Sequence, residues 1–433
     1  MKLYGSTGGS RLAKGRAAAR RRNPFKPLAA VLCCLLAVEV LYFTAVYSSN
    51  SFITKWRNIY ISTAMDTMSH QWLATAFIPG DVIQGVMDKR QASMDAQKGL
   101  SSGWTKTPEA TEPEPETKPT EIPAQVTEVP VQTEEEQEAQ ARASFFELFY
   151  EVDETSMDGY LNAHPEALDN GWDRIYINEA GLDDSGTDIE TVHGEQVLAI
   201  DAVNRILLVR VEGSGWRGVL AVAKDPSHLS LQPSSQLGVI GETAAAIAEA
   251  HNGVLAMTGS GFDDPNGNGN GGLLLGYAMC DGKALGNHST IRGAKRLELH
   301  EDDLLYIYDA SDPVGDGCTD AVEWQPALVV DGQDVVPWGY DGIHPRACIG
   351  QTDKYEILML VIEGRLYAKG ILGTDLYTCA DILLRHNCMQ AMSVDGGASA
   401  MLWYDGEPVI QCSNGSRDGR TLPTAFVYGR NEE

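Results

Sequence analysis

Five consecutive residues, Asp395 to Ser399, combine a carboxylate, two glycines and a hydroxyl. A fixed carboxylate can stabilise a positive centre or activate water, and glycines let the backbone approach a ligand closely. The same residues are also typical of a tight turn, because Gly accepts positive φ and Asp bonds its own backbone. The chemical interpretation therefore depends on the elements that position this segment and on the residues beside it.

The segment is predicted to follow a buried strand. Ile357–Ile362 is a continuous apolar run, which is typical of a strand buried on both faces. Thr374 can cap an apolar helix that ends at Asn387. Ala391–Val394 then returns as a strand, which places Asp395 at the turn of a βαβ unit. Ligands of open α/β sheets bind beyond the carboxyl ends of strands, which favours a binding site at Asp395.

Other patterns predict an α+β fold, with mixed β-sheets flanked by helices. Asp405-Gly406 lies between two apolar runs, Met401–Tyr404 and Glu407–Ile410, and is a strong hairpin signal. The remaining predicted elements are the strands Gln196–Ile200, Ile206–Val211, Gly218–Ala223 and Val254–Met257 and the helix Thr243–Ala250.

Composition divides the 433 residues into five parts. They are a basic tail (1–27), an apolar span (28–47), a juxtamembrane helical segment (48–99), a disordered linker rich in Pro, Glu and Thr (100–143) and a compact domain (144–433). The span has about 20 mostly apolar residues, enough to cross a bilayer. Positive charge before it and acid after it predict a single-pass anchor in the cell membrane, with a cytoplasmic N-terminus and an extracytoplasmic domain. A cleaved signal peptide is disfavoured, because the apolar core is too long and no A-x-A site follows it.

The juxtamembrane segment leaves two interpretations open. Aromatic and apolar residues mix with polar ones at loosely helical spacing. One interpretation is an amphipathic helix that lies on the outer membrane face or pairs with a partner protein. The other is a helical stalk that packs on itself.

Charge excludes one class of function. The chain has a formal net charge of −27, and the part beyond the span carries about −34. Such a surface repels nucleic acid, so nucleic-acid binding is excluded. An acidic protein that binds a phosphate ester must concentrate arginine locally, and Arg346, Arg365 and Arg420 are the candidates.

Four stretches, in this order, resemble the phosphodiester glycosidase family. The family carries HPRTAIG-like, DGR-like, NLDGGGSS-like and PSDG…R…NA-like segments. Here they correspond to His344–Gly350 (HPRACIG), Glu363–Arg365 (EGR), Ser393–Ala400 (SVDGGASA) and Ser413–Ala425. The likeness extends from about Val197 to Gly429.

The chain departs from the family's usual residues at four positions. Asn is common in the family where this chain has Thr258, Ser393 and Thr424, and a third Gly where it has Ala398. Each missing Asn removes an amide that could orient a sugar hydroxyl.

The resemblance implies an α+β fold and hydrolysis of a sugar-1-phosphodiester, in which a carbohydrate is linked through phosphate. The expected catalytic residues are Asp395, with Glu363 as second carboxylate and His344 for proton transfer. Structural alternatives for the last two are a strand-end salt bridge between Glu363 and Arg365 and a histidine in a turn. The expected substrate-binding residues are Arg346, Arg365, Gly396, Gly397, Ser399, Asp418, Arg420, Gly261 and Phe262.

No cofactor is expected, although one loop could bind Ca²⁺. Asp264, Asn266 and Asn268 followed by Gly269 copy the first half of an EF-hand loop. Leu275 occupies the twelfth position, where a bidentate Glu is needed, so an EF-hand is excluded. The alternatives are a looser calcium site and a Gly/Asn loop at the mouth of the active site. Six cysteines beyond the span permit three disulfides or buried free thiols.

Two rival functions remain. A serine hydrolase would need glycines two residues either side of Ser399, but Met401 occupies one of these positions. A non-catalytic cell-surface module that binds glycan, with a role in exopolysaccharide or cell-envelope metabolism, is the alternative from another class.

Overall fold

The structure is a computed structural model that describes residues 25–104, 133–183, 186–286 and 293–431. Most of the predicted basic tail and the middle of the predicted linker lie outside these residues. The chain forms two compact units, Met1–Arg57 and Asn58–Glu433. The fold combines helices with antiparallel sheets, so the predicted α+β class is confirmed.

In the first unit, helix α1 (Phe25–Tyr47) contains the predicted span. Its stretch Lys26–Tyr47 is long and apolar enough to cross a membrane. Helix α2 (Ser51–Met65) begins in this unit and continues into the second.

The segment that follows the first unit, residues 58–104, packs against the large domain. It contains most of α2, then α3 (Trp72–Thr75) and α4 (Gly80–Asp95). The Trp338 amide donates to Ser93 Oγ at 2.8 Å, and the Lys295 ammonium donates to the Gln97 carbonyl at 2.8 Å. The expected helices are present, and they pack on themselves around a hydrophobic core of their own: Ile61, Ala64, Ala74, Ile78, Ile83 and Val86. From Asn58 onward they also belong to the same unit as the domain, which neither interpretation of this segment anticipated.

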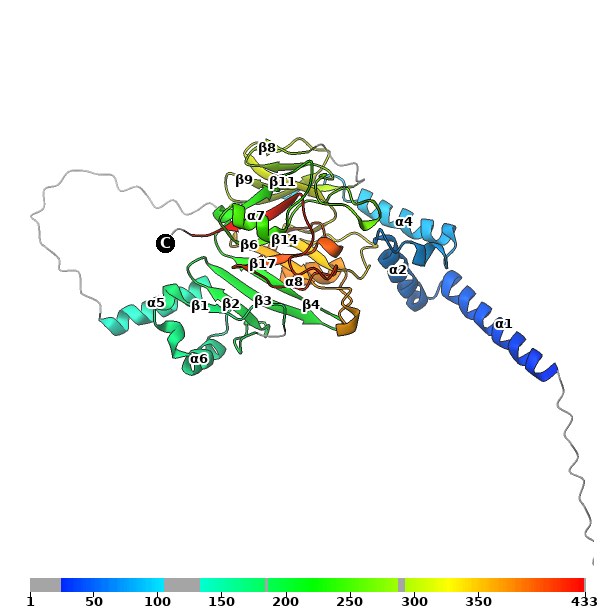
Figure 1. Cartoon of the computed structure of the whole chain (residues 1–433), viewed down its shortest axis with the longest axis horizontal. Helices are drawn as coiled ribbons and strands as arrows, with labels where there is room; N and C mark the ends of the chain where they lie inside the picture. Colours follow the sequence, from blue (N-terminus) through cyan, green and yellow to red (C-terminus); the bar gives the residue numbers. More distant parts are fainter. Residues whose placement is uncertain (1–24, 105–132, 184–185, 287–292, 432–433) are drawn as a thin grey trace, which may run out of the picture. The chain divides into compact units, whose positions relative to one another are not determined.

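A nine-stranded sheet forms the centre of the large unit (Figure 1). In spatial order its strands are β1 (Tyr176–Asn178), β2 (Val197–Asp201), β3 (Ile206–Gly213), β4 (Trp216–Ala223), β15 (Ile357–Ile362), β14 (Arg346–Thr352), β16 (Cys388–Ser393), β12 (Ala327–Val330) and β13 (Gln333–Asp334).

Both faces of this sheet are buried, as the apolar run of β15 predicts. Ile357, Met359 and Val361 belong to one hydrophobic core, and the alternate residues Leu358 and Leu360 belong to another. This alternation follows from the two-residue period of a strand.

Two five-stranded sheets complete the large unit. One has the order β10 (Leu305–Asp309), β9 (Lys295–His300), β11 (Cys318–Trp324), β7 (Ala278–Cys280) and β8 (Lys283–Ala284). The other has the order β18 (Glu407–Pro408), β17 (Leu402–Tyr404), β6 (Gly253–Thr258), β19 (Thr424–Gly429) and β5 (Leu229–Pro233), with helix α7 (Ala244–Ala250) packed on β6. The predicted hairpin is confirmed, because Asp405 and Gly406 both have positive φ between β17 and β18.

The predicted βαβ unit is formed by β15, helix α8 (Leu376–Arg385) and β16. Both strands pair antiparallel with β14, so they run parallel to each other with β14 between them. The cap of α8 differs by one residue from the expected Thr374. The Asp375 carboxylate accepts from the Thr378 amide at 2.8 Å, while the Thr374 backbone pairs with His344.

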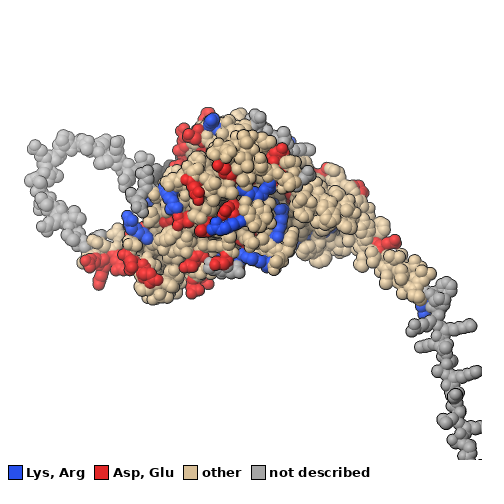
Figure 2. All heavy atoms as spheres, viewed as in Figure 1, with Lys and Arg blue, Asp and Glu red and all other residues tan. Residues whose placement is uncertain are grey.

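The predicted linker, 100–143, is too long at both ends. Trp104 Nε1 donates to the Leu305 carbonyl at 2.7 Å, which ties residues near 104 to the domain. Helix α5 (Glu134–Leu148) begins with a capping box between Thr133 and Glu136, and acidic residues in a first turn favour a helix N-terminus. Acidic side chains gather at the lower left of Figure 2, over α5 and α6 (Glu154–Ala163).

Short 3-10 helices occupy connecting loops: η1 (Pro165–Leu168), η2 (Trp172–Arg174), η3 (Pro226–His228), η4 (Pro265–Gly267), η5 (Tyr367–Lys369) and η6 (Gly397–Ser399). All eight cysteines are free thiols, and five of those beyond the span are buried in the hydrophobic cores: Cys280, Cys348, Cys379, Cys388 and Cys412. The second of the two alternatives for the cysteines therefore describes this fold.

Candidate functional site

A cavity of about 510 Å³ lies at one end of the nine-stranded sheet. Because β14 runs antiparallel to β15 and β16, the start of β14 meets the ends of both neighbours. This register brings Arg346, Arg365 and Asp395 to one edge, and all three line the cavity. Three sequence motifs separated by up to about 50 residues therefore converge on one site.

The turn after β16 fits tightly against the start of β14. The Gly397 amide donates to the Pro345 carbonyl at 3.0 Å, and Gly397 has a φ of +59°. A Cβ on Gly396 would lie 3.0 Å from the same carbonyl oxygen. Both glycines are therefore needed for the turn itself, and the turn holds Asp395 in the cavity wall.

Asp395 has an unusual protonation equilibrium. Burial raises the pKa of this carboxyl to about 7, although a hydrogen bond from Ser399 and the charge of Arg420 oppose the rise. A carboxyl that titrates near neutral pH is suited to proton transfer at that pH. Ser399 is buried in η6 and serves as a partner of Asp395.

Two arginines in the cavity wall have no carboxylate partner among the described residues. Arg346 Nε donates to the Thr374 carbonyl at 3.1 Å, and its Nη2 donates to the Gly342 carbonyl. Arg365 donates to Thr67 Oγ1 at 3.4 Å. Burial and the positive charge of Arg346 lower the pKa of Arg365. Two neighbouring cations without an acid provide a site for an anion.

Arg420, in contrast, is already paired. Its guanidinium donates to both oxygens of Asp264, at 2.8 and 3.0 Å, and lies over the Phe262 ring at 4.7 Å. The hydrogen bonds from Arg420 lower the pKa of Asp264. The predicted calcium ligand Asp264 thus holds an arginine, which leaves the Ca²⁺ hypothesis for Asp264, Asn266 and Asn268 without support from this geometry.

His344 is a neutral imidazole with a defined tautomer. Burial and the charges of Arg346 and Arg365 hold the pKa of His344 well below its usual value. Its Nδ1 lies 3.3 Å from Arg365 Nη2, and arginine can only donate, so the ring proton is on Nε2. Nε2 lies 3.9 Å from Asp66 Oδ2, and a hydrogen bond to the Ser62 backbone partly opposes the fall in the pKa of His344.

Several expected site residues lie outside the cavity lining. Glu363 is buried and pairs with Arg217 at 2.6 Å, rather than with Arg365. Asp418 pairs with Arg417 at 3.1 Å. A Cβ on Gly261 would lie 2.1 Å from the Trp324 ring, so this glycine permits close packing there.

The departures from the family's asparagines fall into two groups. Thr258 and Thr424 are fully buried and do not line the cavity. Both hydroxyls form hydrogen bonds within the protein: Thr258 Oγ1 donates to the Ser399 carbonyl at 2.5 Å, and Thr424 Oγ1 accepts from the Ser260 amide at 2.8 Å. Ser393 does line the cavity. Only one of the three positions therefore lines the cavity.

Sequence reasoning missed a whole wall of the cavity. Asp66, Thr67, Met68 and Ser69 line it from the loop after α2, and Arg90 lines it from α4. No motif marks these residues, which lie some 280 residues before His344. Asp66 pairs with Arg90 only through the fold, so the sequence holds no signal for this wall.

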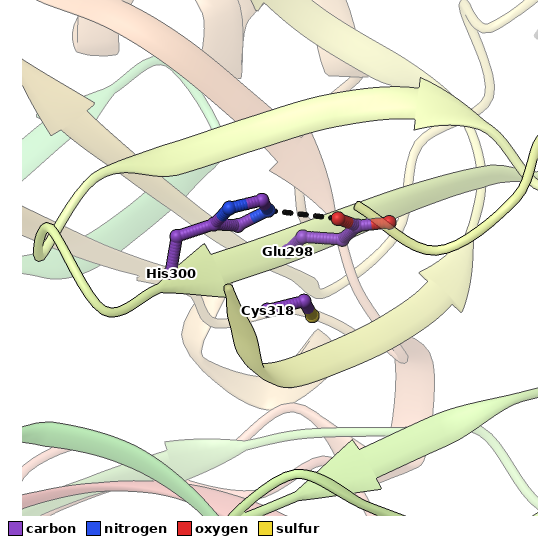
Figure 3. A group of neighbouring side chains, drawn as sticks. All are labelled: Glu298, His300 and Cys318. Carbon is purple, nitrogen blue, oxygen red and sulfur yellow. Dashed lines mark hydrogen bonds and ion pairs between the residues drawn. The ribbon is translucent and has the colours of Figure 1, made fainter. Parts of the chain in front are cut away.

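A second group of reactive side chains lies elsewhere. Figure 3 shows Glu298, His300 and Cys318, whose candidate ligand atoms lie within 4.8 Å of one another. Arg296 Nε donates to Glu298 Oε1 at 2.6 Å, and burial raises the pKa of Cys318 to about 12. Glu298 thus pairs with both Arg296 and His300, and the group forms an ion-pair network.

The pKa of Asp395 predicts a pH-dependent stability. The pKa of Asp395 is about 7 in the folded protein, and its ordinary value is 3.8. Between pH 3.8 and pH 7 the folded protein therefore keeps a proton on Asp395 that the unfolded chain has released, and this proton stabilises the folded state relative to its stability at higher pH. This contribution is therefore lost as pH rises through 7, and Asp395→Asn is expected to raise Tm relative to wild type more at pH 8 than at pH 5. Differential scanning calorimetry at the two pH values checks this, and an equal shift at both would contradict the raised pKa.

Comparison with known proteins agrees with this geometry. Residues 251–428 match the sequence profile of the phosphodiester glycosidase family. The matched range includes Arg346, Arg365, Asp395 and Arg420 but not the wall formed by Asp66–Ser69.

Two solved structures are similar to this chain at low sequence identity. One is the catalytic domain of zebrafish N-acetylglucosamine-1-phosphodiester alpha-N-acetylglucosaminidase, auto-inhibited by its pro-peptide. Its sequence is 19% identical to this chain, and the TM-score is 0.43. The match covers 52% of this chain and 82% of that one. A hypothetical protein from Synechocystis is 14% identical with a TM-score of 0.37, covering 51% of this chain and 61% of that one.

One curated relative is the SPbeta prophage-derived uncharacterized protein YomE of Bacillus subtilis. It is 24% identical over 187 residues, or 40% of this chain. The matched part spans only 28% of the length of that relative.

Proposed function

We propose that this protein is a membrane-tethered extracytoplasmic glycosidase that hydrolyses a sugar-1-phosphodiester and releases the sugar. One observation carries the proposal. Two arginines without a carboxylate partner among the described residues share a cavity with a carboxyl whose pKa is about 7. The family match of residues 251–428 supports the same class of reaction.

The chemistry assigns separate tasks to these side chains. Cleavage at the anomeric carbon passes through an oxocarbenium-like state and expels a phosphate monoester. Phosphate is a good leaving group, so charge neutralisation contributes more than protonation. Arg346 and Arg365 stabilise the departing phosphate, which leaves with the electron pair of the broken carbon–oxygen bond.

Asp395 has the complementary task. In its ionised form it accepts a proton from the water whose oxygen bonds to the anomeric carbon, and its charge stabilises the positive ring. Gly396 and Gly397 present backbone at the cavity wall, and Ser399 orients the Asp395 carboxylate by its hydrogen bond.

Arg420 and its partner contribute to the wall rather than to the phosphate subsite. The Asp264 carboxylate already neutralises Arg420, and the guanidinium covers the Phe262 ring. This pair shapes the side of the cavity where the sugar is expected to lie. Both side chains contact each other through two hydrogen bonds, so the wall is rigid.

Two helices, α1 and α2, support the proposal of a membrane tether. The length and apolar composition of α1 suit a single span. Phe52, Trp56 and Tyr60 recur every four residues along α2, share one face and are exposed. Exposed aromatic residues next to a span are typical of the membrane–water interface, and the charge bias around the span supports an extracytoplasmic domain.

The pH dependence of the reaction follows from Asp395. A base must be ionised, so kcat/KM is expected to rise about tenfold per pH unit below 7 and to level off above it. Initial rates of sugar release from a UDP-sugar or a nitrophenyl sugar phosphodiester, from pH 5 to 9, check this. Rates that fall as pH rises through 7 would show that the protonated carboxyl is the active form.

A further inference from the structure

A loop outside the family-matched range completes the cavity. Asp66–Ser69 line it together with residues of that range. We propose that this loop is part of the phosphate subsite and that Thr67 is a positioning residue, which holds Arg365 in place for the substrate phosphate. The proposal deepens the function proposed above and rests on it.

Hydrogen bonds fix the loop to the domain from its two flanking helices. From α2, Thr63 Oγ1 accepts from the Ile343 amide at 3.0 Å, next to His344. From α4, the Arg90 guanidinium lies 3.9 Å from the centre of the Tyr340 ring and donates to Asp66 Oδ1 at 2.6 Å. The segment is therefore anchored immediately beside two lining residues, Tyr340 and His344.

Thr67 is arranged to accept from Arg365. Its hydroxyl donates to the Thr63 carbonyl at 3.1 Å, so the proton points along the helix and the oxygen lone pairs remain for the guanidinium, 3.4 Å away. Thr67 is buried, which strengthens this contact. The same Arg365 nitrogen, Nη2, also donates to His344 Nδ1 at 3.3 Å, and neither acceptor carries a negative charge.

The loop acts as a wall and leaves room for a ligand. With Asp66–Ser69 in place the cavity still has about 510 Å³, within the range of sites for small molecules. A segment that occluded the site would fill this volume. The segment between the span and the domain therefore contributes to substrate binding in addition to linking the two.

Thr67→Val in the full chain tests the proposal, with Thr67→Ser as the conservative variant. Thr75→Val is the matched control, because Thr75 is exposed on α3 and does not line the cavity. Removing one hydrogen bond to a charged group is expected to raise KM for the sugar phosphodiester about tenfold, with kcat changed less. Thr67→Ser and Thr75→Val are expected to keep the wild-type KM.

Binding measurements separate this proposal from the hydrolysis itself. Calorimetric titration with a sugar 1-phosphate and with the free sugar is expected to show weaker binding of the phosphate by Thr67→Val and unchanged binding of the free sugar. This result supports the loop even if no hydrolysis is detected. An unchanged phosphate affinity, or a KM that falls because the loop competes with substrate, would overturn the proposal while the hydrolytic function stands.

Discussion

Asp395→Asn is expected to lower the turnover of a sugar phosphodiester about a thousandfold while the protein stays folded. The amide keeps the shape of the side chain but cannot accept a proton from water or stabilise a positive ring. Because Asn is neutral, it also removes the cost of ionising a carboxyl that burial disfavours, so the loss of activity is not accompanied by a loss of stability. Sugar release from a UDP-sugar measures the change.

Asp381→Asn is the matched control, since Asp381 lies on the exposed face of α8 and does not line the cavity. It is expected to keep wild-type turnover. Undiminished turnover by Asp395→Asn would remove Asp395 from the mechanism. A wild-type protein that binds glycan saturably but forms no product would instead favour the non-catalytic binding module.

Arg365→Met has the second largest expected effect. The substitution keeps an unbranched side chain but removes the fork that contacts phosphate, so KM is expected to rise about a hundredfold. Burial and the neighbouring charge of Arg346 both disfavour the Arg365 cation. The variant is therefore expected to have a Tm at or above the wild-type value, as happens when an active site holds destabilising charge.

Steady-state kinetics and calorimetry on the same preparation check both parts of this prediction. Arg385→Met provides the control, because Arg385 is at the exposed end of α8 and pairs with Glu195, away from the cavity. A large fall in Tm for Arg365→Met would mean that Arg365 stabilises the fold, and an unchanged KM would exclude it from the phosphate subsite.

The sequence predicts the elements around the site well, because their patterns are local. The apolar run of β15 and the Asp405-Gly406 hairpin both appear where expected. The order of the strands in the sheet is harder to predict from the sequence. Strand β14 lies between β15 and β16, and this placement depends on long-range contacts that no local pattern encodes. That insertion is what brings Arg346 beside Asp395.

The site residues were predictable only as far as their motifs reach. Arg346, Arg365 and Asp395 stand in segments that resemble the family, and the register of three strands brings them together. Glu363 illustrates the limit of this reasoning. Two residues before Arg365 in the chain, it points to Arg217 on the neighbouring strand β4 instead of into the cavity.

The wall at Asp66–Ser69 could not be found from sequence. Its contribution depends on long-range packing, such as the contact of Arg90 with the Tyr340 ring. Residues 58–104 have the composition of a stalk, yet they pack on the domain because Ser93 and Lys295 supply polar contacts across that boundary. Tertiary contacts of this kind override what a local pattern indicates.

Hydrolysis in water labelled with heavy oxygen tests the central claim most directly. The purified chain is incubated with a sugar-1-phosphodiester in labelled water, and both products are analysed by mass spectrometry. Attack at the anomeric carbon, as the positions of Asp395 and the two arginines predict, places the label in the released sugar. Label in the phosphate product instead would show cleavage at phosphorus and contradict a glycosidase.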